Sequence, residues 1–170
     1  MLELRLPKAA DEAVLRSAYA ELAGEGHDGF LLDGFDDNPQ DFSGWLTRVY
    51  DHSEGLNIPE GKVPATFLLA VVSGEVVGRI SIRHQLNDFL MNFGGHIGYM
   101  VRPSHRRKGY ATEMLRQAKA IAKSLGINIA LVTCNDDNLG SITVIESQGG
   151  VLENIVDENG RALRRYWITL

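Results

Sequence analysis

The segment of residues 96–126 constrains the fold of this chain more than any other, because it combines a strand, a basic turn and a long helix. Residues 96–101 have the pattern of a short strand, and Pro103 ends it because proline has no N–H to donate to a ladder. Gly126 is a typical stop for the helix that follows. One face of this predicted helix carries apolar residues at helical spacing: Ala111, Met114, Leu115, Ala118, Ile121, Ala122 and Leu125.

The turn between strand and helix, Arg106-Arg107-Lys108-Gly109-Tyr110-Ala111, has the composition of an anion site. The first N–H groups of a helix have no partner within the helix and lie at the positive end of its dipole. Gly109 lets the backbone approach a ligand closely, since it has no Cβ. These features predict a pyrophosphate site. The three-glycine dinucleotide fingerprint and the P-loop both match poorly, because the turn has a single glycine.

The composition of the chain limits its partners. With 170 residues and no Pro/Gly/Ser-rich linker, residues 1–170 are expected to form one domain. A net charge of −5 argues against nucleic-acid binding, and no apolar stretch reaches the ~18 residues that a membrane span needs. The single cysteine, Cys134, and the lack of a secretory signal favour a cytoplasmic location. The scattered histidines predict no metal site.

The rest of the chain has the pattern of a mixture of strands and helices. A strand with alternating Leu2, Leu4 and Leu6 is followed by a helix over residues 11–22, and residues 24–40 form a loop rich in glycine. A second helix follows, with Phe42, Trp45, Leu46 and Val49 facing inward. Further strands are predicted over residues 66–72, 76–83, 129–133, 151–156 and 164–170, with a helix over 139–148 and a loop over 84–95.

The basic turn resembles the acyl-CoA pyrophosphate loop of the GNAT N-acetyltransferase superfamily, whose pattern is Arg or Gln, two residues, Gly, one residue, then Gly or Ala. Arg106, Gly109 and Ala111 occupy those positions. The similarity extends to residues 95–99, before the turn, and to residues 138–141, after the helix, and points to the ribosomal-protein-type branch. It covers residues 66–150 well and the N-terminal third poorly.

The resemblance implies an α/β fold with a mixed, mostly antiparallel central sheet flanked by helices on both faces. It also implies acetyl-CoA as the cofactor. Asn138 and Ser141 are expected to cap a helix, either alone or while also contacting the pantetheine arm. The residues expected to bind the cofactor are Met100, Val101, Arg106, Arg107, Lys108, Gly109, Tyr110, Ala111, Thr112, Asn138 and Ser141.

Acetyl transfer to an amine needs an unprotonated nucleophile and a proton for the leaving thiolate. His96 stands where related enzymes have a carboxylate, and an imidazole with a pKa near ~6.5 can accept the proton of the amine at neutral pH. The alternative is that His96 is a half-buried strand residue bonded to a neighbour. Many family members protonate the thiolate with a tyrosine at the position of Ile145, which has no proton to give.

Tyr166 and Cys134 are the candidates to replace that missing tyrosine, with ordered water as a third option. Each also has a purely structural alternative, Tyr166 as a packing residue at a strand edge and Cys134 as an ordinary buried thiol. Proximity and orientation could supply most of the rate without a dedicated acid. The sequence leaves this choice open.

Candidate acceptor-binding residues lie in the loop of residues 84–95 and in the N-terminal region, where surface solvation and core packing are the alternatives. An acidic pocket would suit a cationic amine. The candidates are Asp28, Phe30, Trp45, His84, Asn87 and Asp88.

Two classes of function stay open from the sequence. The first is an acetyl-CoA-dependent N-acetyltransferase that acts on a primary amine of a small molecule or a peptide N-terminus by direct attack in a ternary complex. The second is a non-catalytic acyl-CoA-binding sensor, motivated by Ile145, and a protein that binds another diphosphate is a further option. The oligomeric state is open as well, with a homodimer as one possibility.

Overall fold

The structure of the protein is a computed structural model that describes residues 1–24 and 29–170. Seven strands form one sheet in the order β1-β2-β3-β4-β5-β7-β6. Neighbouring strands are antiparallel except β4 and β5, which run parallel at the centre of the sheet. The strands are β1 (Leu2–Arg5), β2 (Ala65–Val72), β3 (Glu75–Arg83), β4 (Ile97–Val101), β5 (Ile129–Asn135), β6 (Val151–Glu158) and β7 (Arg161–Thr169).

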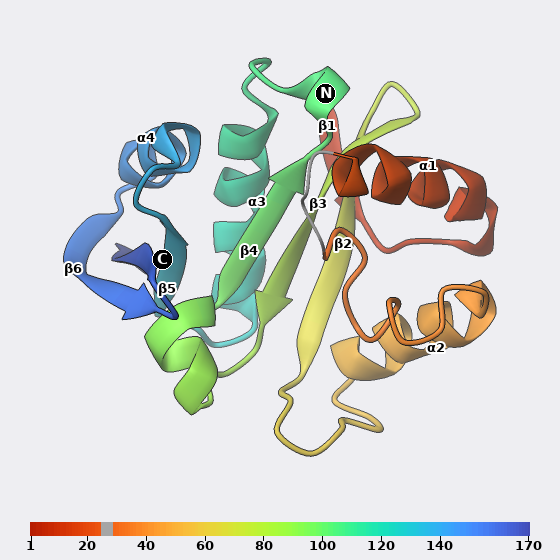
Figure 1. Ribbon diagram of the computed structural model, residues 1–170, viewed down its shortest axis with the longest axis horizontal. Coiled ribbons are helices and arrows are strands. Elements are labelled where there is room, and N and C mark those ends of the chain that lie inside the picture. Colours follow the sequence, from red (N-terminus) through yellow and green to blue (C-terminus); the bar gives the residue numbers. More distant parts are fainter. Residues whose placement is uncertain (25–28) are drawn as a thin grey trace.

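Helices cover both faces of the sheet (Figure 1). On one face, α1 (Glu12–Ala23) and α2 (Phe42–Ser53) pack around the fully buried Trp45. On the other, α3 (Tyr110–Ser124) and α4 (Leu139–Ser147) pack with a second apolar cluster that includes Tyr166. Single 3-10 turns span Ala9–Asp11 and Pro103–His105, and one π-helical turn spans Leu90–Gly94.

The mixed, mostly antiparallel sheet with helices on both faces confirms the predicted fold class. The differences are local. The predicted loop of residues 84–95 contains the π-helical turn, whose first amide is capped by the Asn87 side chain at 2.9 Å. Leu125, expected to face the core, is 39% exposed because α3 ends one residue before it. Side-chain caps and the exact ends of helices decide these local differences, and sequence periodicity does not reveal them.

The sheet opens between its two central strands. β4 and β5 are joined by a single residue pair, Ile97 with Val132, whereas β3 is paired along the whole length of β4 and β7 along the whole length of β5. Beyond that pair the parallel strands diverge. One edge of β4 is therefore left without a neighbouring strand in the middle of the sheet, which is the feature that positions the candidate site.

Gly95 and His96 form the junction at which β4 and β5 part. Gly95 has a φ of +65°, and a Cβ at this position would lie 2.7 Å from the Leu131 carbonyl oxygen. The backbone N–H of His96 donates to the same oxygen at 2.7 Å. A residue with a side chain would be strained at position 95 by its φ and would also push the two strands apart.

We predict that Gly95→Ala lowers the free energy of unfolding by about 3 kcal/mol, because left-handed strain and a steric contact add. Gly74→Ala is the matched control, since Gly74 has a φ of +83° but nothing within 4 Å of the new methyl group. It should cost only about 1 kcal/mol. Urea unfolding measures both, and equal losses would contradict the close approach as a cause.

Candidate functional site

The open edge of β4 presents backbone groups toward the gap. The Arg102 N–H donates to the Val77 carbonyl of β3 at 2.9 Å, and strand alternation then directs the peptide groups of Met100 toward β3 as well. The peptide groups of Tyr99 and Val101 point the other way, where β5 has diverged. Of the two residues predicted to contact the cofactor through their backbone, only Val101 therefore offers its amide to the gap.

The basic turn leads into α3 beside this gap. Gly109 is the residue before the helix and has a φ of +78°, and Arg107 has a φ of +62°. Within the described residues, the amides of residues 107–112 donate no hydrogen bond to a protein acceptor. Residues 106–109 are exposed, and Tyr110, Ala111 and Thr112 are partly buried in the first turn of α3. This is a row of free N–H donors at the positive end of a helix dipole.

The start of α4 lies on the same face of the sheet as α3. The Asn138 side chain accepts a hydrogen bond from the Ser141 N–H at 3.0 Å, which confirms the predicted helix cap. Both residues remain accessible at the end of the helix. Contact of either one with a cofactor stays a prediction.

Tyr99 is a site residue that the sequence did not single out. Its hydroxyl is buried and has no hydrogen-bond partner among the described residues. Burial raises the pKa of Tyr99 to about 12, while the nearby Ser141 hydroxyl opposes the rise without forming a well-directed hydrogen bond. A buried donor without a partner destabilises the protein unless a ligand supplies one. Sequence alternation could have placed Tyr99 beside the gap, but nothing in the sequence marked its hydroxyl as unpaired.

His96 is held by its neighbour across the junction. Its side chain is buried, and Nδ1 accepts a hydrogen bond from the Leu131 N–H at 2.9 Å. Burial lowers its pKa, and the positive charge of Arg83 lowers it further. The imidazole is therefore neutral at pH 7 with its proton on Nε2, so it can donate there but has no free lone pair for a proton. The geometry favours the structural alternative for His96 over the role of a base.

Tyr166 and Cys134 differ in what they could donate. The Tyr166 side chain is fully buried, and its hydroxyl donates to a Glu146 carboxylate oxygen at 3.0 Å near the end of α4. The Cys134 thiol is half-buried, and burial raises its pKa to about 11. Ile145, at the usual tyrosine position, is fully buried in the core. Tyr166 is thus committed to packing and to Glu146, whereas Cys134 stays protonated at neutral pH.

The predicted acceptor residues mostly have structural roles. Phe30 and Trp45 have no exposed surface and pack in the cluster under α1 and α2. His84 is bonded to the Thr66 hydroxyl at 2.8 Å, and burial lowers its pKa. Asn87 binds the Gly61 carbonyl at 2.9 Å. Phe30 and Trp45 therefore have packing roles, and a role of His84 or Asn87 toward an acceptor stays a prediction.

Two acidic residues were also predicted to contact the acceptor. Asp88 is exposed at the start of the π-helical turn, where its carbonyl accepts from the Asn92 amide at 2.7 Å. Asp28 lies outside the described residues. A role of either residue toward an acceptor stays a prediction.

Two arginines of β3, which the sequence did not mark as functional, lie on the opposite face of the sheet, where α1 and α2 pack. The Arg79 guanidinium donates to the carbonyl oxygens of Gly29, Phe30 and Gly98 at 2.7, 3.0 and 3.2 Å. Burial lowers its pKa to about 9, helped by the charge of Arg83. The available signal was a pair of cations, four residues apart, inside an apolar strand pattern.

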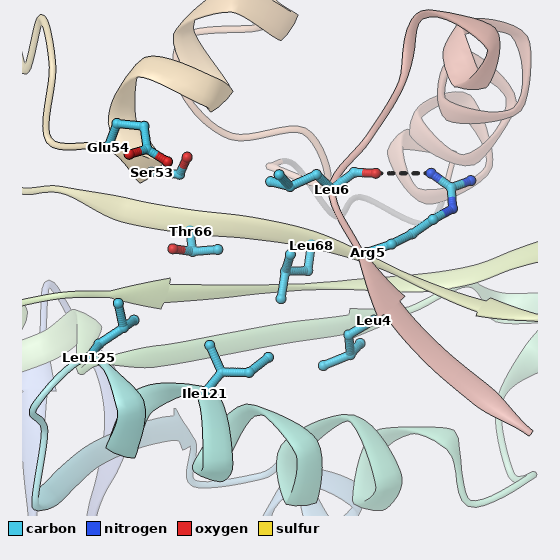
Figure 2. Close-up of a pocket in the computed structure, with 9 residues that line it drawn as sticks. All are labelled: Leu4, Arg5, Leu6, Ser53, Glu54, Thr66, Leu68, Ile121 and Leu125. Atoms are coloured by element: carbon cyan, nitrogen blue, oxygen red, sulfur yellow. Dashed lines mark hydrogen bonds between the residues drawn. The ribbon is translucent and has the colours of Figure 1, made fainter.

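A separate hollow of about 400 Å³ lies at the β1–β2 edge of the sheet (Figure 2). Its walls are largely aliphatic and include Leu4, Leu68, Ile121 and Leu125, with the ends of α2 and α3 above and below. None of its lining residues belongs to the basic turn or to β4. It is therefore not part of the candidate site.

Two further classes of site were sought in residues 1–24 and 29–170. No group of three or more His, Cys, Asp or Glu side chains there could hold a metal ion. In the same ranges, no helix combines the length and apolar character needed to cross a membrane.

Residues 2–151 match the family model of the acetyltransferase (GNAT) domain. The yncA protein of Salmonella typhimurium, solved with its cofactor acetyl-CoA, shares the fold with a TM-score of 0.68 and 17% identity over 99% of this chain and 93% of that chain. An acetyl transfer enzyme from Salmonella typhimurium that modifies the N-terminal serine of ribosomal protein L7/L12 has a TM-score of 0.69 and 17% identity, covering 99% and 95% of the two chains.

A chimera of the spermidine N-acetyltransferase SpeG from Vibrio cholerae and hSSAT has a TM-score of 0.66 and 18% identity, over 99% of this chain and 95% of that chain. No curated protein sequence matches the chain. The low identities mean that these structures report the shared fold.

We predict that His96 is the neutral Nε2–H tautomer and titrates below the ordinary value of about 6.5. Its lowered pKa means that the unfolded chain binds the proton more tightly, so His96 should stabilise the fold less as pH falls below about 6.5. Nitrogen-15 NMR of the imidazole measures both properties. An Nδ1–H tautomer, or a pKa above the ordinary value, would restore His96 as a candidate base.

Proposed function

We propose the reaction of this protein from one premise, that the chain belongs to the GNAT acetyltransferase family, whose model matches residues 2–151 of its 170. The protein is an acetyl-CoA-dependent N-acetyltransferase. It transfers the acetyl group to a primary amine of a small molecule or a peptide N-terminus by direct attack in a ternary complex. The structural neighbours that act on spermidine and on an N-terminal serine support both kinds of acceptor.

The observation that carries the proposal is the row of free amides at residues 107–112. Such donors at a helix N-terminus fit a pyrophosphate, and Arg107 and Lys108 add positive charge at the exposed rim. A methyl group added at Gly109 would have nothing within 4 Å, so the space in front of the turn is open to a ligand. The residues present therefore fit the diphosphate of acetyl-CoA.

The gap between β4 and β5 fits the rest of the cofactor. The outward-facing amides of Tyr99 and Val101 can hydrogen-bond an extended amide chain as a neighbouring strand would. Ser141, at the start of α4, lies near the Tyr99 hydroxyl, and Asn138 caps the same helix. These groups would hold the pantetheine arm and orient its end toward Gly98.

Acetyl-CoA supplies an activated acetyl group as a thioester. The β4 amides at Tyr99 and Val101 can polarise its carbonyl, and preorganised donors of this kind typically contribute about 3 kcal/mol to catalysis. The Tyr99 hydroxyl keeps its proton at neutral pH, since its pKa is raised to about 12, and it can release that proton to the departing sulfur. Tyr99 thereby takes the role that Ile145 cannot fill, with the Cys134 thiol as the nearby alternative.

The hypothesis of a non-catalytic sensor arose because Ile145 cannot donate a proton. The Tyr99 hydroxyl offers a proton donor that the sensor hypothesis had taken to be missing, so this reason no longer holds. We therefore favour catalysis. The cytoplasmic location and the homodimer remain proposals from the sequence.

The cofactor site is tested by Gly109→Ala, which should weaken acetyl-CoA binding by about tenfold or more, because the methyl group projects into the space of the diphosphate. Gly126→Ala is the matched control at the other end of α3, where φ is +87° and the surroundings are equally open. Both changes should cost about 1 kcal/mol of stability.

Isothermal titration calorimetry measures the affinity of the wild type and of each variant for acetyl-CoA. Thiol release with a panel of amines measures turnover. Unchanged affinity in Gly109→Ala would mean that the diphosphate lies elsewhere. Tight binding by the wild type without turnover of any amine would return the sensor as the function.

Tyr99→Phe should lower kcat by about tenfold to a hundredfold and leave acetyl-CoA affinity nearly unchanged, since only the proton donor is lost. The variant should be as stable as the wild type, because the deleted hydroxyl makes no hydrogen bond. Cys134→Ala is the comparison, and it should retain turnover. The opposite pattern, with Cys134→Ala slow and Tyr99→Phe normal, would assign the proton to the thiol.

A further inference from the structure

The face of the sheet opposite α3 and α4 contains a cation without a bonded anion. Arg83 follows Arg79 by four residues on β3, so both guanidinium groups rise from the same face. Arg83 is partly buried, and the single hydrogen bond that its guanidinium makes among the described residues is a long one, from Nη1 to the Gly94 carbonyl at 3.4 Å. Its Nε and Nη2 donors are left for a ligand.

Asp33 is the carboxylate that acts electrostatically on both arginines, but it hydrogen-bonds neither. Its Oδ1 is bonded to Nδ1 of His52 at 2.8 Å, inside the cluster under α2. Burying a positive charge without a bonded partner is costly, and burial accordingly lowers the pKa of Arg83. Within residues 1–24 and 29–170, no carboxylate is bonded to the Arg83 donors, which thus form an anion site.

The guanidinium of Arg83 lies directly against the centre of β4. Its Nη1 is 3.0 Å from the position that a Cβ on Gly98 would occupy, so glycine at this position makes the room for it. Gly98 precedes Tyr99, whose amide and hydroxyl face the proposed thioester. Arg79 fixes this arrangement by tying the Gly98 carbonyl to the loop at Gly29 and Phe30.

An acceptor amine must reach the thioester from this face, because the turn before α3, the start of α4 and the Tyr99 hydroxyl occupy the other. The amine would then lie within a few atoms of the Arg83 guanidinium. A polyamine is itself cationic, so the two arginines would repel it. In a peptide, the α-carboxyl of the first residue is part of an uncharged amide, so it offers no carboxylate to bind. An α-amino acid has a carboxylate one carbon from its amine, which matches this spacing.

We propose that the acceptor is a free α-amino acid, and that Arg83 binds its carboxylate while Arg79 positions the strand beneath it. This inference rests on the proposed acetyltransferase function and narrows its acceptor class. It also reverses the expectation of a cationic acceptor. Guanidinium groups bind carboxylates in a paired, planar geometry, so Arg83 would orient the amine as well as select the acceptor.

The first test compares α-amino acids with their α-carboxamides as acceptors, by thiol release from acetyl-CoA. The amine of a carboxamide is less basic and more of it is unprotonated at neutral pH, so chemistry alone favours the carboxamide. We expect kcat/KM to be at least about tenfold higher for the acids. Equal or faster turnover of carboxamides, peptides or spermidine would overturn the inference and leave the acetyltransferase function intact.

The second test is Arg83→Gln, with Arg116→Gln as a control of equal charge change on the exposed surface of α3. Arg83→Gln should raise KM for the amino acid by about thirtyfold or more, abolish the preference over carboxamides and leave acetyl-CoA affinity unchanged. A retained preference in a folded variant would contradict the role of Arg83. If the variant unfolds, the acceptor comparison on the wild type still decides the acceptor class. Absence of any turnover together with absence of acetyl-CoA binding would instead reject the proposed function itself.

Discussion

The separation of β4 from β5 is the constraint on which the rest of the site depends. A continuous sheet would satisfy the backbone of β4 on both edges and leave no place for a cofactor chain. Gly95 sets the junction at which the strands part, because only glycine accepts its positive φ and its close approach to the Leu131 carbonyl. The His96 side chain then completes the junction by accepting the Leu131 N–H. The gap is thus built into the fold and does not require a movement to form.

Polar groups without protein partners gather around this gap. Among the described residues, the amides of residues 107–112, the Tyr99 hydroxyl, and Nε and Nη2 of Arg83 have no protein partner. A buried group of this kind, such as the Tyr99 hydroxyl, costs stability in the free protein unless a ligand pairs with it. Each group suits a different part of the proposed reactants. The amides suit phosphates, the Tyr99 hydroxyl can give a proton to the sulfur, and Arg83 can bind a carboxylate.

The sequence predicted those parts of the site that depend on local structure. The strand, the turn at Gly109, the long helix and the Asn138 cap all arise within a few residues and were found correctly. Roles set by tertiary contacts were missed. His96 looked like a base because the hydrogen bond from Leu131 comes from another strand, and Phe30 and Trp45 looked accessible because their burial depends on the packing of α1 and α2. Arg83 gave a signal, a cation within an apolar strand, that composition alone could not interpret.

The central claim is that acetyl-CoA occupies the gap and the turn that leads into α3. Amide NMR with nitrogen-15 labelled protein measures this directly, because each backbone N–H reports its own hydrogen bond. On addition of acetyl-CoA, we expect the largest shifts at the amides of residues 107–112, Tyr99 and Val101. Shifts confined to other regions, such as the hollow beside Leu4 and Leu125 (Figure 2), would contradict this placement of the cofactor.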